Sequence, residues 1–169
     1  MKSALLLAFF YLAAVSGCKS QSNADLASDS GKVVQLNKNS PMLDIVGSWK
    51  GIGSISIVDK KISFSNCENA IVTIRAVSAN HFSLKDQFTC DRGATVFTSG
   101  ISQFDIAGQA VYLKGEPVGS ITAGNINMHF LQGIAEVQLI LTVNQNRLHY
   151  EFLSQSSGAY SSASADLVQ

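Results

Sequence analysis

The stretch that decides the fold is Gly47-Ser48-Trp49-Lys50-Gly51-Ile52-Gly53-Ser54-Ile55-Ser56-Ile57, which contains the only tryptophan of the chain. From here to the end, apolar and polar residues alternate over short runs, with the period of two that half-buried strands show. Glycines separate most of these runs, and no sustained helical periodicity follows. The sequence therefore predicts an all-β domain with almost no helix.

The expected strands, about eight to ten in number, follow one another without long crossovers, which favours a single antiparallel up-and-down barrel. Closing the sheet into a barrel would remove its exposed edges. Both prolines, Pro41 and Pro117, lie outside the centres of the expected strands, where backbone donors are needed. An open β-sandwich is the alternative architecture, and no local feature decides between the two.

The Gly-x-Trp motif at the start of the first strand resembles the signature of lipocalins and other calycin barrels. The resemblance implies that the indole packs across the closed end of a barrel whose mouth holds a small apolar or amphipathic ligand. The alternative is that the same side chains simply fill the interior, as they do in barrels of about eight strands. The candidate ligand contacts are Trp49, Phe82, Tyr112, Met128 and Tyr150.

The N-terminus contains an apolar run, residues 4–14, that is too short to span a bilayer and is typical of a secretory signal. The tetrad Val15-Ser16-Gly17-Cys18 that follows resembles the lipobox of bacterial lipoproteins. The resemblance implies a signal peptide over 1–17 and a mature chain that begins at Cys18, whose thiol carries fatty acyl chains such as palmitate. The alternative is an ordinary signal peptide with an incidental cysteine. Lys19 points to the outer membrane of the bacterial cell envelope in that family.

The composition divides the remaining chain into a polar tether over residues 18–41 and a β-barrel domain over 42–169. The full chain has 12 basic and 12 acidic residues and no basic cluster, which argues against nucleic acid as a partner. The expected partners are therefore the membrane, through the lipid, and either a small apolar ligand or another envelope protein. The sequence does not indicate an oligomeric state.

Cys67 and Cys90 remain once Cys18 is assigned to the lipid, and in an oxidising compartment two cysteines predict a disulfide. The first precedes the run 71–77 and the second ends the run 81–90. A disulfide would therefore tie the open end of an antiparallel hairpin. A metal site or a catalytic thiol is less favoured, because the paired spacing of zinc sites is missing.

The chain carries no G-x-S-x-G elbow, P-loop, H-E-x-x-H or dinucleotide motif, so we expect no enzyme activity, no catalytic residue, no cofactor and no metal. His149 and Glu151 share one face of an expected strand and suggest an acid–base pair or two metal ligands. The alternation with Leu148, Tyr150 and Phe152 instead favours a polar outer face.

Asp86 is the most unusual acidic residue, because it falls between Leu84 and Phe88 where the alternation requires an inward side chain. It is either an inward polar group of a ligand pocket or the mark of a break in strand register. The register break is the favoured interpretation.

The segment Ser156-Ser157-Gly158-Ala159-Tyr160 resembles the S-G-x-x-Y loop of membrane-bound lysozyme inhibitors, although its glycine-to-tyrosine spacing is one residue shorter. The resemblance implies that Ser157, Gly158 and Tyr160 contact a partner protein from a serine-rich loop over residues 154–162. The expected function is thus a non-catalytic binding module or a structural role in the envelope, with a protein inhibitor as the alternative.

Overall fold

A computed structural model describes residues 34, 36, 38–58 and 62–169 of the chain. The predicted signal peptide, the predicted lipid site Cys18 and most of the predicted tether lie outside these residues. No helix of the described residues has the length and apolar character needed to cross a membrane.

The described chain is built almost entirely from antiparallel strands, with one short 3₁₀ turn, η1 (Asp91–Gly93). Most of the strands alternate inward apolar residues with outward polar ones, as the sequence predicts. The strands are β1 (Gly47–Ile57), β2 (Ile62–Ser78), β3 (His81–Cys90), β4 (Thr95–Phe97), β5 (Ile101–Ala107), β6 (Ala110–Leu113), β7 (Glu116–Thr122), β8 (Asn125–Gln132), β9 (Ala135–Asn144), β10 (Arg147–Ser156) and β11 (Ala159–Val168).

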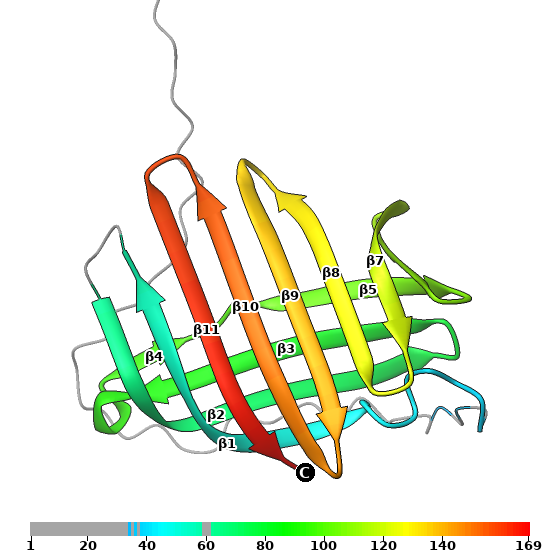
Figure 1. The fold of residues 1–169 in the computed structure, drawn as a ribbon, viewed down its shortest axis with the longest axis horizontal. Helices are drawn as coiled ribbons and strands as arrows, with labels where there is room; N and C mark the ends of the chain where they lie inside the picture. The colour runs from blue at the N-terminus through cyan, green and yellow to red at the C-terminus, as the bar shows by residue number, and fades with distance from the viewer. Residues whose placement is uncertain (1–33, 35, 37, 59–61) are drawn as a thin grey trace, which may run out of the picture. The chain divides into compact units, whose positions relative to one another are not determined.

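The strands form a closed barrel in the order β2-β1-β11-β10-β9-β8-β7-β6-β5-β3, and a pairing between β2 and β3 completes the circle. β4 and β5 both pair with β3, at its end and its beginning, so together they occupy one position in the wall. In Figure 1, strands β8 to β11 cross in front of β2, β3 and β5. The predicted up-and-down barrel is confirmed.

The glycines of β1 allow the wall to bend between these two layers. The pairing of β1 with β2 shifts register on both sides of Gly53, and both strands curve along their length (Figure 1). A Cβ at Gly53 would lie 2.6 Å from the ring of Phe88 and 2.7 Å from the carbonyl oxygen of Ser164. Because no side chain fits, Phe88 packs directly against the backbone of β1.

Trp49 packs beside the turn that precedes β1. Its Nε1 donates a hydrogen bond to the carbonyl oxygen of Ile45 at 2.9 Å. The N–H of Val46 donates to the carbonyl oxygen of Met42 at 3.0 Å and closes the turn. Trp49, Met42 and Ile45 are all buried in the hydrophobic core. The only tryptophan therefore fastens the entering chain to the barrel.

The disulfide between Cys67 and Cys90 is confirmed, with the two sulfurs 2.10 Å apart. β2 and β3 pair in antiparallel register from Asn69 opposite Thr89 onward, so the disulfide ties the open end of this hairpin. Closing a loop of 23 residues stabilises the folded state by about 3 kcal/mol on the chain-entropy argument.

The predicted serine-rich loop over residues 154–162 is wrong. β10 continues to Ser156 and β11 begins at Ala159, so only Ser157 and Gly158 lie outside the strands. The small residues of β11 stand opposite large ones of β10, with Ala163 opposite Phe152 and Ala165 opposite Tyr150. Small side chains here make room for the aromatic rings and do not mark a loop.

Candidate functional site

The barrel interior is filled by side chains. Of the predicted ligand contacts, Trp49, Phe82, Met128 and Tyr150 are buried in the core, with at most 1% of each exposed. Tyr112 does not join them, because its neighbour Val111 takes the buried position on β6. A pocket between Leu84, Ser99, Ser102, Phe104, Phe130, Gln132, Val137, Leu139 and Phe152 has a volume of about 20 Å³. This space is close to that of one water molecule.

Asp86 is the polar centre of this interior. The alternation of β3 continues unbroken through Leu84, Asp86 and Phe88, and all three are buried. The favoured prediction of a register break at Asp86 is therefore wrong, and the side chain points inward, as the alternative required. That Asp86 belongs to a ligand pocket stays a prediction. The break lies in the neighbouring position of the wall, between the end of β4 and the start of β5.

The carboxylate of Asp86 holds that break together. The backbone N–H of Ser99 donates to Oδ1 at 2.6 Å, and the Ser99 hydroxyl donates to Oδ2 at 2.7 Å. The Tyr150 hydroxyl also donates to Oδ2, and the hydroxyl of Thr98 donates to the Asp86 carbonyl oxygen at 2.6 Å. A buried carboxylate is tolerated only with such partners. Burial, reinforced by the Asp86 charge, raises the pKa of Tyr150 well above 10, so its hydroxyl remains a donor.

The barrel wall has a gap beside the short β6–β7 hairpin. Pro117 has no N–H to donate, and the β6–β7 register shifts between Val111 and Tyr112. The pairing of β7 with β8 stops at Gly119 opposite Met128. No described strand pairs with residues 129–132 of β8 on the side of β8 that faces β7. Likewise, no described strand pairs with residues 101–104 of β5 on the side that faces away from β3.

This gap opens into a groove of about 910 Å³, here called the rim notch. The wall on β3 and β5 is polar, whereas the wall on β6, β7 and β8 combines apolar residues with Lys114, Glu116, His129 and Gln132. Sequence reasoning missed the notch, although Pro117 was its signal. The lining residues are His81, Ser102, Gln103, Asp105, Leu113, Lys114, Glu116, Pro117, Val118, His129, Phe130, Leu131, Gln132 and Gly133.

The two walls of the rim notch differ in chemistry. On the polar wall, Nδ1 of His81 lies 2.7 Å from a carboxylate oxygen of Asp105. On the other wall Leu131 is 73% exposed, and Ile134 at the adjoining β8–β9 turn is 80% exposed. Aliphatic side chains this exposed are typical of contact sites when they gather at a groove.

The rim notch leads towards the interior. Ser102, Phe130 and Gln132 line both the notch and the small inner pocket. Ser99, which Asp86 holds, lines the same inner pocket. The segment fastened by Asp86 thus lies at the inner end of the notch.

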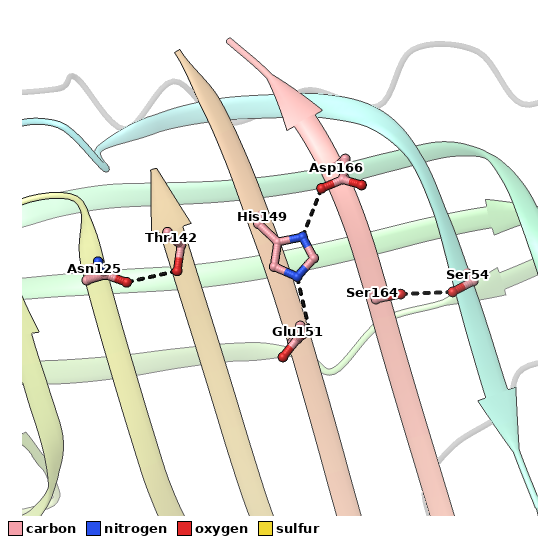
Figure 2. Close-up of polar contacts among 7 residues, drawn as sticks. All are labelled: Ser54, Asn125, Thr142, His149, Glu151, Ser164 and Asp166. Carbon is pink, nitrogen blue, oxygen red and sulfur yellow. Dashed lines mark hydrogen bonds and ion pairs between the residues drawn. The ribbon is translucent and has the colours of Figure 1, made fainter. Parts of the chain in front are cut away.

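The predicted pair His149 and Glu151 lies on the outer face of β10 (Figure 2). Nε2 of His149 lies 3.0 Å from Oε1 of Glu151, and Nδ1 lies 2.8 Å from Oδ1 of Asp166. Asp166 was missed because only the register of β10 against β11 places it opposite His149. Both ring nitrogens are engaged, and the described residues contain no group of three side chains suited to a metal ion.

The two carboxylates raise the pKa of His149 above its ordinary value of 6.5, with the hydrogen bond to Glu151 as the largest cause and that to Asp166 next. Figure 2 shows two further cross-strand pairs, Ser54 with Ser164 and Asn125 with Thr142. Outward residues of neighbouring strands thus satisfy one another, and the ring has no free nitrogen to abstract a proton.

The three residues predicted to contact a partner protein lie at the β10–β11 turn. Ser157 and Gly158 form the exposed turn, and Tyr160 lies on β11 with 37% of its side chain exposed. The carbonyl oxygen of Tyr160 accepts a hydrogen bond from the N–H of Val58 at 2.9 Å. The segment is thus part of the barrel wall.

No protein-family model and no curated protein sequence matches this chain. Among solved structures, a protein of unknown function from the DUF3598 family of Nostoc punctiforme is similar over 75% of this chain and 48% of its own, with 12% identity and a TM-score of 0.50. The chain has a lipocalin-like β-barrel fold. It spans about half the length of that protein, and the likeness extends to the fold alone.

Two further structures are similar at lower TM-scores. The S-type phycobiliprotein lyase CPES from Guillardia theta is 13% identical over 75% of this chain and 88% of its own, with a TM-score of 0.48. A redesigned β barrel is 13% identical over 80% of this chain and 98% of its own, with a TM-score of 0.43.

We predict that Tyr150→Phe destabilises the lipocalin-like barrel by about 1–3 kcal/mol, because the buried Asp86 carboxylate loses a donor that nothing replaces. The measurement is the free energy of unfolding in urea at pH 7 with the disulfide intact. The matched control is Tyr112→Phe, whose half-buried hydroxyl donates to no group in the described part of the chain. A control effect equal to that of Tyr150→Phe would contradict the role given to Asp86.

We predict that His149 makes stability depend on pH. Its pKa is higher in the folded than in the unfolded chain, so the protonated ring stabilises the fold fully below about pH 6.5, and this contribution is lost as pH rises through the folded pKa. The difference in unfolding free energy between wild type and His149→Gln should therefore shrink from about pH 6 to pH 8.5. A difference that stays constant over this range would refute the assignment.

Proposed function

We propose that this protein is a non-catalytic binding module of the bacterial cell envelope, which holds an amphipathic ligand in the rim notch. The observation that carries the proposal is the two-sided lining of the notch. Leu131 and Phe130 offer apolar surface on one wall, while the ion-paired His81 and Asp105 offer polar surface on the other. A ligand with one apolar and one polar side matches both walls.

The volumes favour the notch over the barrel interior. Ligand sites usually measure about 300–1,000 Å³. The notch has about 910 Å³, whereas the inner pocket has about 20 Å³. Three of the predicted ligand contacts, Trp49, Phe82 and Tyr150, occupy the interior themselves. The ligand of this barrel therefore binds at a gap in the wall.

The Asp86 carboxylate near the inner end of the notch is suited to a structural role. It is buried and receives donors on both oxygens, whereas a general base requires a free lone pair within reach of substrate. The protein-inhibitor alternative has less support, since its predicted loop is strand except for Ser157 and Gly158.

The envelope location rests on the N-terminal sequence. The tetrad that ends at Cys18 resembles a lipobox, and the polar residues 19–41 follow it. Such an anchor would keep the binding module at the membrane that supplies amphipathic molecules.

We predict that Cys18→Ala moves the protein from the membrane fraction to the soluble fraction and abolishes incorporation of labelled palmitate. The reason is that acyl chains contribute about 0.8 kcal/mol for each buried methylene. The measurement is fractionation of cells expressing the full chain, with Ser20→Ala as the neighbouring control. Undiminished labelling of the Cys18 variant would remove the envelope part of the proposal.

We predict that wild-type protein purified from its own membrane retains a ligand that native mass spectrometry detects, and that Leu131→Asp abolishes this retention. A carboxylate placed against apolar ligand surface loses its hydration at a cost of a few kcal/mol. The control is Ile52→Asp, which changes an equally exposed aliphatic residue of β1 (67%) away from the notch. Retention by both variants, or a wild type without any ligand, would contradict the proposal.

A further inference from the structure

The edge of β8 at the rim notch presents backbone groups to the groove. The N–H of Val143 on β9 donates to the carbonyl oxygen of Gly124 at 2.6 Å, so the backbone of Gly124 faces β9. Successive residues of a strand direct their backbone groups to opposite sides. By this alternation the even-numbered residues of β8 face β9, whereas His129 and Leu131 face the notch.

β5 presents a second edge across the same groove. The N–H of Ile106 donates to the carbonyl oxygen of Asn80, next to β3, at 2.8 Å. The backbone of Gln103, an odd number of residues away, therefore faces the notch. β5 and β8 are separated by β6 and β7, which is three strand spacings or about 14 Å. Where that hairpin has ended, the gap has room for extended chain.

These two edges are short, but they contain neither lysine nor proline. Proteins commonly guard exposed edges with lysine, proline or a charged inward residue. β7 has such a guard in Pro117, but the β8 edge reads His129-Phe130-Leu131-Gln132 and the β5 edge reads Ser102-Gln103-Phe104. An unguarded pair of edges that face each other across a groove is suited to accept a strand.

We infer that the ligand of the rim notch is an extended peptide segment of a partner protein, which pairs with the edge of β8 as an added strand. This inference rests on the proposed function and names its ligand class. Backbone donors and acceptors that repeat about every 6.8 Å are matched by another extended backbone, and an acyl chain offers no such groups. Successive side chains of the bound segment would lie in turn beside Phe130, on the inner face of β8, and beside Leu131, on its outer face. We therefore expect apolar and polar residues to alternate along the segment.

The experiment selects peptides of about twelve random residues, longer than a typical strand, from a phage library against the full chain in detergent. The recovered peptides should alternate apolar and polar residues. A synthetic copy of the most enriched peptide should slow hydrogen exchange at the amides of His129 and Leu131. Leu131→Pro should raise its Kd about tenfold, as expected when one hydrogen bond of about 1.4 kcal/mol is lost.

Leu131→Ala is the matched control, because it shortens the same side chain and keeps the backbone N–H. It should weaken binding less than Leu131→Pro does, and unfolding curves should show both variants folded. Strand pairing is refuted if the two variants lose the same affinity for the peptide. It is also refuted if the peptide leaves hydrogen exchange at His129 and Leu131 unchanged, or if peptides are enriched no more on the wild type than on Leu131→Pro.

The failure of this inference is distinguishable from failure of the proposed function. If wild-type protein from its own membrane retains a small molecule that Leu131→Asp loses, and no peptide is selected, the binding module stands and the peptide ligand is refuted. If neither a small molecule nor a peptide binds at the notch, both proposals fail.

Discussion

The Asp86 carboxylate is the interaction on which the rest of this barrel depends. It lies in an otherwise apolar interior and receives donors from Ser99 and Tyr150. Those donors come from opposite parts of the wall, the break between β4 and β5 and the middle of β10. Because an unpaired buried carboxylate is so unfavourable, the interior is stable only when both parts of the wall are in place. One acidic residue thus fixes the position at which the wall is interrupted.

That interruption and the short β6–β7 hairpin together explain the rim notch. Ser99 and Ser102 flank the start of β5 and line the pocket at the inner end of the groove. Pro117 and the shifted register of β6 against β7 end the neighbouring pairing early. The gap therefore arises from specific residues on both sides of it. A closed barrel otherwise leaves few strand edges open, so this gap concentrates unpaired backbone in one place.

The sequence was sufficient for the architecture because strand alternation, Trp49 and the two cysteines are local signals. It failed where the deciding information is long-range. Asp86 was interpreted as a register break because its partners are 13 and 64 residues away. The serine-rich stretch looked like a loop because the aromatic rings that need small neighbours belong to another strand. The contact between Asp166 and His149 and the position of the notch were missed for the same reason, because both are set by the register between strands.

A filled barrel changes where binding can occur. Trp49, Phe82 and Tyr150 are buried in the core, and the pocket between Leu84, Phe104 and Phe152 measures only about 20 Å³, far less than such a side chain occupies. Opening such a space would leave cavities that cost about 2–5 kcal/mol for each large side chain removed. A gap in the wall provides the proposed binding groove without that cost. The backbone groups exposed at the gap form hydrogen bonds to water, and a bound partner would replace that water. The interruption that Asp86 stabilises therefore lies at the inner end of the groove proposed to bind the ligand.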